Sequence, residues 1–349
     1  MRSHHAPTVP GRLGRRLAAG LALTATGVLV AGCAGDPGAS GAAPSADAPV
    51  SAAIQFGWLP NVENMATIVA DQKGYFDEEG IDLEILPGGP DVTADAQVAG
   101  GNALMGILSA EALANSISAG SGLVAIAAMY QTTSSAIVTL ADSGISEPAD
   151  LVGRKLGMSQ TDVPVYTPFF DLVGVDPEGI EQVLVGSDPA ALASGEVDAI
   201  TGTLPNQPVV LAAQGLDVEA ISLADFGYNR WSGLLVVREE SLQDDAQRAQ
   251  IEAMLRAITH GLEDSVADPE AAGEIVYEAY GEQLGLELET QVEGAKIWAD
   301  LAQRNTEDTG LMVVDDAGLA ELQTFFDAVG IEQKAADIFD LSVAEEVFE

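Results

Sequence analysis

The sequence predicts an α/β protein whose folded part has two lobes, each with a mostly parallel β-sheet flanked by helices. Three observations lead to this prediction. Segments with strand spacing alternate with segments with helix spacing, which is typical of parallel sheets. The alternation restarts after Ser146-Glu147-Pro148, where a proline two residues after a serine predicts the start of a helix. The 300 residues after position 49 (349 minus 49) also exceed what a single hydrophobic core usually supports.

The first lobe begins with a short apolar segment and continues with alternating strands and helices. Asn61 can cap a helix, and Gly74 can end it. Ile81, Leu83 and Ile85 alternate with acidic residues, which is the spacing of a half-buried strand. The same reasoning predicts strands over 54–56, 81–85, 103–107 and 123–129, and helices after Asn61, over 92–99 and after Ser109.

The second lobe repeats this pattern, and the chain then returns to the first. Asp188-Pro189 places a cap and a proline ahead of a short helix that Gly195 ends. From Gln247 onward apolar residues recur every three or four positions, as they do in helices. Strands are expected over 155–158, 197–201 and 234–237, and a helix is expected through 169–173. The expected division is 1–32 for a signal peptide, 33–49 for a lipidated cysteine and tether, 50–140 for the first part of lobe I, 141–230 for lobe II and 231–349 for the rest of lobe I.

The N-terminus has the features of an export signal followed by a lipid anchor. The first 32 residues hold four arginines and no acidic residue, with an apolar stretch from Leu17 to Ala31. Val30-Ala31-Gly32-Cys33 resembles a lipobox, in which lipid is attached to the cysteine. Residues 34–49 are small residues, proline and glycine, which predict a flexible tether. We therefore expect a protein held on the outer face of the cytoplasmic membrane through lipid on Cys33.

Composition excludes several classes of function. Cys33 is the only cysteine, which excludes disulfides, thiolate catalysis and cysteine metal sites from the folded part. Without the four signal arginines the chain has ten Lys and Arg against 54 Asp and Glu, a net charge of -44. Binding of nucleic acid or of anionic lipid through a basic surface is excluded, because both require clustered Lys and Arg.

Four stretches in order carry a resemblance to a known family. They are GWLPNVENMATIVADQKGYFDEEGIDLEILPGGP from Gly57, AGGNALMGI from Ala99, ISEPADLVGRKLGM from Ile145 and ALASGEVDAITG from Ala191. Together with the lipobox, they resemble the nitrate, sulfonate, taurine and thiamine-precursor branch of the substrate-binding lipoproteins of ABC importers. The resemblance implies a type II periplasmic-binding fold that holds ligand in the cleft between lobes, with no catalysis and no cofactor or metal. It also implies a monomer whose partners are an ABC permease and its ATPase.

The ligand class stays open between two branches of that family. Trp58, Pro60 and Asn61 match the tryptophan-x-proline-asparagine motif of members that bind thiamine pyrimidine precursors or riboflavin. Gly57 and Asn64 stand where those members usually carry aspartate and histidine. The acidic charge and the flat indole favour a small planar ligand that is neutral or cationic. The alternative is a sulfonate, taurine or nitrate ligand, which helix N-termini and Arg230 can hold.

Candidate binding residues follow from where parallel strands end. Ligands of open α/β sheets sit beyond the carboxyl ends of the strands, beside helix N-termini. The resemblance implies two crossings between the lobes, which we place near 135–141 and 228–236, and Tyr228 and Trp231 of the second crossing either touch ligand or fill the hinge. The candidates are Trp58, Asn61, Glu63, Asn64, Ser109, Gln131, Thr132, Ser159, Gln160, Thr161, Thr203, Asn206, Tyr228 and Trp231.

Two other classes of function stay open beside transport. A fungal pyrimidine synthase shares the fold expected here, but it relies on a histidine and a cysteine cluster. Behind the signal peptide this chain has His260 alone, within an expected helix, and it lacks the common catalytic and phosphate-binding motifs. A sensor module that presents ligand to a membrane receptor is the third class. Neither sequence pattern nor composition separates a sensor from a transporter component.

Overall fold

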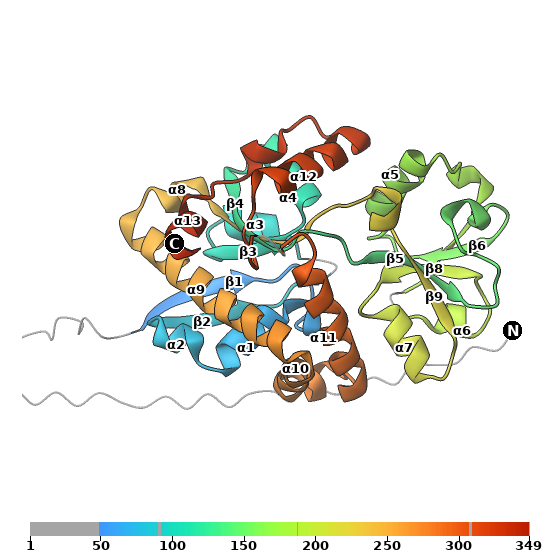
Figure 1. The fold of residues 1–349 in the computed structure, drawn as a ribbon, viewed down its shortest axis with the longest axis horizontal. Helices are drawn as coiled ribbons and strands as arrows, with labels where there is room; N and C mark the ends of the chain where they lie inside the picture. Colours follow the sequence, from blue (N-terminus) through green and yellow to red (C-terminus); the bar gives the residue numbers. More distant parts are fainter. Residues whose placement is uncertain (1–48, 90–91, 187, 307–308, 349) are drawn as a thin grey trace, which may run out of the picture. The chain divides into compact units, whose positions relative to one another are not determined.

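The computed structural model describes residues 49–89, 92–186, 188–306 and 309–348. The expected signal peptide, the lipid site at Cys33 and nearly all of the expected tether lie outside the described residues. The described part contains two five-stranded sheets, each flanked by helices (Figure 1). This arrangement confirms the predicted α/β fold with two lobes. Within these ranges, no helix is both long enough and apolar enough to cross a membrane.

The sheet of lobe I has the strand order β2-β1-β3-β10-β4. Four of its strands point the same way, because β1 is parallel to β2 and β3, while β10 is antiparallel to both β3 and β4. The strands are β1 Val50–Gln55, β2 Ile81–Leu86, β3 Met105–Leu108, β4 Leu123–Tyr130 and β10 Ser232–Arg238. All five expected strands of this sheet are present, but β1 starts four residues earlier than the strand expected over 54–56.

The sheet of lobe II has the order β7-β6-β8-β5-β9 and, like the first sheet, contains one reversed strand. Strand β6 is parallel to β7 and β8, whereas β5 is antiparallel to β8 and β9. The strands are β5 Ser135–Leu140, β6 Lys155–Met158, β7 Glu181–Leu184, β8 Ala199–Thr203 and β9 Val218–Ser222. The sequence patterns predicted β6 and β8 but not the short strands β7 and β9, of which β7 is mostly exposed.

Each sheet has one reversed strand because the chain passes between the lobes twice. β4 ends beside lobe II, and residues 131–134 carry the chain over to β5. Residues 223–231 bring it back to β10. The strand that enters a sheet from the other lobe must run away from the junction, whereas the other strands run toward it. The structure therefore corrects both expected crossings: Ser135–Leu140 is a strand of lobe II rather than a connection, and residues 232–236 belong to β10 of lobe I.

Local capping accounts for where several helices start. The Asn61 side chain accepts a hydrogen bond from the Glu63 N–H at 2.8 Å, and the Ser109 hydroxyl accepts one from the Ala112 N–H at 3.2 Å. The Asp188 carboxylate accepts one from the Ala190 N–H at 2.8 Å, but the N-cap of the helix that follows is Pro189, one residue later than expected. The helices of the two lobes are η1 Val62–Asn64, α1 Met65–Gln72, α2 Tyr75–Glu78, α3 Ala94–Ala99, α4 Ala110–Ser118, η2 Pro148–Leu151, α5 Val163–Val173, η3 Pro177–Gly179, α6 Ala190–Ala193, α7 Gln207–Ala213, η4 Ala224–Phe226 and α8 Glu239–Leu242.

The predicted helical tail is confirmed and returns to lobe I. Helix α9 packs along α1 against the first sheet, and their buried side chains share one core with β1 and β4. This burial supplies most of the stability of such helices, because short helices are marginal alone. The tail consists of α9 Asp245–Ala267, α10 Pro269–Leu284, α11 Leu288–Gln303, α12 Asp316–Val329, η5 Ala335–Ile338 and α13 Ser342–Phe348.

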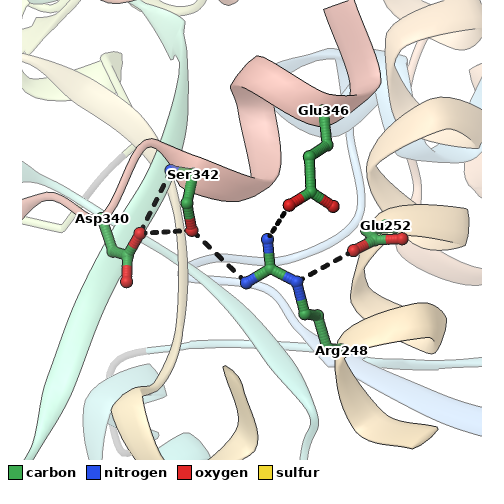
Figure 2. A network of polar contacts seen from close by, with 5 residues as sticks. All are labelled: Arg248, Glu252, Asp340, Ser342 and Glu346. Carbon is green, nitrogen blue, oxygen red and sulfur yellow. Dashed lines mark hydrogen bonds and ion pairs between the residues drawn. The ribbon is translucent and has the colours of Figure 1, made fainter. Parts of the chain in front are cut away.

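The C-terminal segment is tied to the first sheet and to α9. The Asp340 N–H donates to the Ala125 carbonyl of edge strand β4 at 2.9 Å. Arg248 of α9 then links to α13: its Nη2 lies 2.8 Å from Glu346 Oε1, and its Nη1 donates to the Ser342 hydroxyl at 3.3 Å (Figure 2). Its Nε lies 3.1 Å from Glu252 Oε1 within α9. The tail thus covers an edge strand whose backbone groups would otherwise be available for pairing.

Aromatic side chains join the two lobes at the second crossing. The Tyr228 ring meets Phe169 of α5 edge-on at 5.7 Å between centroids and Phe325 of α12 edge-on at 5.1 Å. All three rings are buried in a core that includes residues of both lobes. We call Phe169, Tyr228 and Phe325 the aromatic seam. Edge-to-face pairs of this kind are favourable beyond the area they bury.

Candidate functional site

A cavity of about 540 Å³ lies where the strand ends of the two sheets meet. Its wall includes loops after β1 and β3 of lobe I, loops after β6 and β8 of lobe II, and residues of α11. Nine of the fourteen expected binding residues line it. They are Trp58, Asn61, Glu63, Asn64, Ser109, Ser159, Thr161, Thr203 and Asn206.

The loop after β1 presents an aromatic and an acidic side chain to the cavity. Asn61 caps η1, and the buried Asn64 side chain donates to the Leu59 carbonyl at 3.4 Å. These bonds fix the segment from Leu59 to Asn64, and Trp58 and Glu63 lie partly exposed on the wall. The structural contribution of the tryptophan-x-proline-asparagine motif here is thus the Asn61 cap on η1.

The wall from lobe II is organised by Asp162. Its carboxylate accepts hydrogen bonds from the Ser159 hydroxyl at 2.8 Å and from the Thr201 hydroxyl at 2.7 Å. The Ser159 N–H donates to the same oxygen at 3.0 Å. Nearby, the Tyr166 hydroxyl donates to the Ala136 carbonyl at 2.6 Å, which joins α5 to β5. The loop after β6 is therefore held to strand β8 by a hydrogen bond at the cavity.

One cation serves two carboxylates at this site. Arg230 of the second crossing lines the cavity, and its Nε lies 3.9 Å from Glu111 Oε2 of α4. Burial raises the pKa of the Glu63 carboxyl, and the positive charge of Arg230 partly offsets this. Burial likewise raises the pKa of Glu111 against the same guanidinium. Within the described ranges, the Arg230 Nε–H donates no hydrogen bond.

Five expected residues lie away from the cavity. Gln131 and Thr132 are buried in the first crossing, where the Gln131 amide donates to the Val313 carbonyl at 2.6 Å. Gln160 is exposed. Tyr228 belongs to the aromatic seam, and Trp231 is fully buried with its ring edge-on to Phe339 at 6.3 Å. These two rings fill the core because large apolar area is better buried than placed on a wet wall.

Other residues of the wall were not expected from the sequence. Asp162 and Tyr166 follow the expected strand over 155–158, and Thr201 is the last residue of the expected strand over 197–201, so the rule that selected Ser159 and Thr203 could have included them. Gln291 and Trp298 of α11 line the cavity from the far end of the chain. The Gln291 side chain accepts from the Val62 N–H at 3.3 Å, across 229 positions of sequence. No local pattern signals such a contact.

Comparison with known proteins places the chain in a family. A formylaminopyrimidine-binding protein from Halalkalibacterium halodurans is 29% identical over 227 residues, which is 63% of this chain and 67% of that protein. A 4-amino-5-hydroxymethyl-2-methylpyrimidine phosphate synthase from Legionella pneumophila is 26% identical over 234 residues, 64% of this chain and 71% of that protein.

The fold has counterparts among solved structures as well. The periplasmic aliphatic sulphonate binding protein SsuA from Escherichia coli superposes with a TM-score of 0.63 at 15% identity, over 85% of this chain and 92% of that one. This match confirms the expected type II periplasmic-binding fold. The sequence model of the NMT1/THI5 like family matches residues 61–272, more than half of the chain. The chain therefore belongs to the NMT1/THI5 like family.

Proposed function

We propose that this chain is an extracytoplasmic solute-binding protein that captures a small planar heterocycle between its lobes and delivers it to an ABC importer. The observation that carries the proposal is the cavity of about 540 Å³ between the two sheets, a volume typical of small-molecule sites. Membership of the family and the 29% identity to a formylaminopyrimidine-binding protein support an amino-substituted pyrimidine or a similar ring. The rigid indole of Trp58 offers such a ring a stacking face.

The charges on the wall favour a neutral or cationic ligand over an anion. Glu63 and Asp95 line the cavity, and within the described ranges neither carboxylate makes a hydrogen bond or ion pair of its own. Arg230 is the cation on this wall, and Glu111 lies behind it. An N–H donor of the ligand can use the free carboxylates, whereas a sulfonate or nitrate would meet them with like charge.

Glu63 lowers the stability of the free protein, and we attribute its presence to ligand binding. Its carboxyl has a pKa above the ordinary value, because burial disfavours the charged form. A carboxyl that ionises less readily in the folded state lowers the free energy of unfolding once the pH exceeds its unfolded pKa, about 4.3. At neutral pH, Glu63→Gln should therefore raise the stability of the free protein while it weakens binding of an amino-substituted ring.

We propose binding without catalysis, although one relative is named as a synthase. His260 lies on α9, exposed and edge-on to Tyr75 at 5.5 Å, outside the cavity. Within the described ranges, no three His, Cys, Asp or Glu side chains gather as metal ligands. The groups that do line the cavity can accept and donate hydrogen bonds and stack on a ring.

Isothermal titration of the purified protein tests the ligand class. Formylaminopyrimidine, riboflavin, taurine, an alkanesulfonate and nitrate are titrated into wild type, Trp58→Ala and Glu63→Gln. We expect a heterocycle to bind and each variant to lose about tenfold in affinity or more, about 1.4 kcal/mol. Leu59→Ala and Glu84→Gln are matched controls, because both residues are exposed and lie outside the cavity. Tight sulfonate or nitrate binding that Trp58→Ala leaves unchanged would return the protein to the anion-binding branch.

We also propose that lipid on Cys33 is the only attachment of the protein to the membrane. The support is the sequence before and after Cys33, since this residue lies outside the described ranges. Cys33→Ser should move the protein from the membrane fraction to the soluble or secreted fraction. Retention of that variant in membranes after a high-salt wash would contradict the anchor.

A further inference from the structure

Helix α11 carries a glycine where lobe II comes closest to it. A Cβ atom at Gly294 would lie 2.8 Å from the Pro205 carbonyl oxygen of lobe II and 3.0 Å from Val62 Cγ2 of lobe I. Ordinary contacts begin at about 3.4 Å, so any side chain at 294 would require the Pro205 backbone to withdraw by about 0.6 Å (3.4 minus 2.8). Glycine inside a helix destabilises it by about 0.5–1 kcal/mol relative to alanine. The close approach of the Pro205 backbone explains why a glycine is nevertheless found at 294.

The Pro205 segment belongs to the wall of the cavity. Thr203, Pro205 and Asn206 line it from lobe II, while Gln291 of α11, one turn before Gly294, lines it from lobe I. The preceding Leu204 packs against the core of lobe I, and its N–H donates to the Ser134 carbonyl at 2.8 Å. The contact between Gly294 and Pro205 is therefore a place where the lobes touch at the margin of the ligand space.

Other tight helix glycines in the tail serve packing within lobe I. A Cβ at Gly261 would meet the Ala66 carbonyl oxygen of α1, and one at Gly273 would meet the backbone of Val292. Gly294 differs because its nearest backbone neighbour is in the other lobe. A change at Gly294 thus acts on the separation of the lobes, whereas changes at Gly261 or Gly273 act on the fold of lobe I.

We infer that Gly294 determines how closely the two lobes approach and, through this, the size of ligand that the cavity holds. The inference rests on the proposed function for its second half only, because the separation of the lobes is measurable without ligand. A larger side chain at 294 holds the Pro205 segment away from α11. The cavity then fits a small ring less tightly and accommodates a larger one better.

Gly294→Ala and Gly294→Met test this with three readouts. Alanine and methionine are both better helix formers than glycine, and this gain in helix stability offsets the local crowding. The thermal unfolding temperature should therefore stay close to that of wild type. Affinity for formylaminopyrimidine should fall by about tenfold for alanine and further for methionine. The ratio of riboflavin to formylaminopyrimidine affinity should rise in the same order. Gly281→Ala is the matched control, because the three atoms nearest to a Cβ there all belong to the Tyr277 ring of the same helix.

The third readout is independent of ligand. In the full chain with Cys33→Ser, spin labels at Val152→Cys on lobe II and Val50→Cys on lobe I report the separation of the lobes, since both residues are exposed. Without ligand, the distance distribution should move to longer values in the order glycine, alanine, methionine. The same series in a Val62→Ala background removes the contact within lobe I, and the shift should persist.

The outcomes separate the two proposals. An unchanged distance distribution for Gly294→Met, or an affinity loss that vanishes with Val62→Ala, overturns the role of Gly294. A shifted distribution in a protein that binds neither heterocycle supports that role in the spacing of the lobes and refutes the proposed ligand class instead. A large fall in thermal stability with alanine at 294 would identify the glycine as a packing residue of lobe I and would likewise overturn the inference.

Discussion

Tyr228 gives the sharpest test of how the two lobes are joined, because its ring and its hydroxyl have opposite effects. The ring is fully buried between Phe169 and Phe325 in the aromatic seam. The hydroxyl is buried too, and it finds no hydrogen-bond partner among the described residues. Burial raises the pKa of this hydroxyl, with the negative charge of Glu111 adding to the effect, so the group stays neutral at ordinary pH.

The magnitudes follow from these contacts. Truncating a buried aromatic ring to alanine costs about 3–5 kcal/mol, and two edge-to-face pairs are lost as part of this. Tyr228→Ala should therefore lower the free energy of unfolding by about 4 kcal/mol. Tyr228→Phe keeps the ring and removes a buried polar group without a partner, whose burial costs about 1–3 kcal/mol. The phenylalanine variant should be as stable as wild type or more stable by up to about 1 kcal/mol.

Urea unfolding followed by circular dichroism measures both variants, with ligand titration beside it. Because the ring lies outside the cavity, Tyr228→Phe should bind ligand with unchanged affinity. A loss of more than about 1 kcal/mol in the phenylalanine variant would show that the hydroxyl has a partner and refute the reasoning. A small effect of alanine would show that the aromatic seam does not join the lobes.

The remaining predictions concern the tail and the pH response. Arg248→Ala should lower the free energy of unfolding by about 1–2 kcal/mol, because it removes the contacts between α9 and α13 in Figure 2. Urea unfolding measures this change. The control is Arg304→Ala, since Arg304 is exposed and has no ion pair in the described ranges. Hydrogen bonds from Lys73 and Tyr75 lower the pKa of Asp264. This carboxylate therefore stabilises the fold above about pH 4, and the contribution is lost as acid protonates it. Asp264→Asn should flatten the fall in stability between about pH 5 and 2, and an unchanged slope would exclude that role.

Local rules were enough to predict much of the fold. Asn61 and Ser109 cap helices as their side chains predict, because a cap depends on groups within three residues, whereas Pro189 takes the N-cap position expected for Asp188. The alternation of strands and helices and its restart after Ser146 were enough for two lobes with mostly parallel sheets. The family resemblance was confirmed as well, and it added the expectation of a binding site between the lobes.

The first crossing shows where local rules stop. The sequence of Ser135–Leu140 is a short and mostly apolar run, which fits a connection and a strand equally well. Its pairing with β8 and β9 decides the matter, and those strands lie more than 50 residues further along the chain. The boundary of lobe II was therefore set by hydrogen bonds that no local pattern contains.

The candidate site divides in the same way. The sequence by itself determined which loops follow the strand ends, and so it named Trp58 and Ser159 on the two opposite walls. Only the tertiary structure shows that the Tyr228 and Trp231 side chains are buried in the core and that Gln291 of α11 lines the cavity. The physical reason is that capping and strand spacing act over a few residues, whereas the direction of a large side chain depends on which distant surface can bury it.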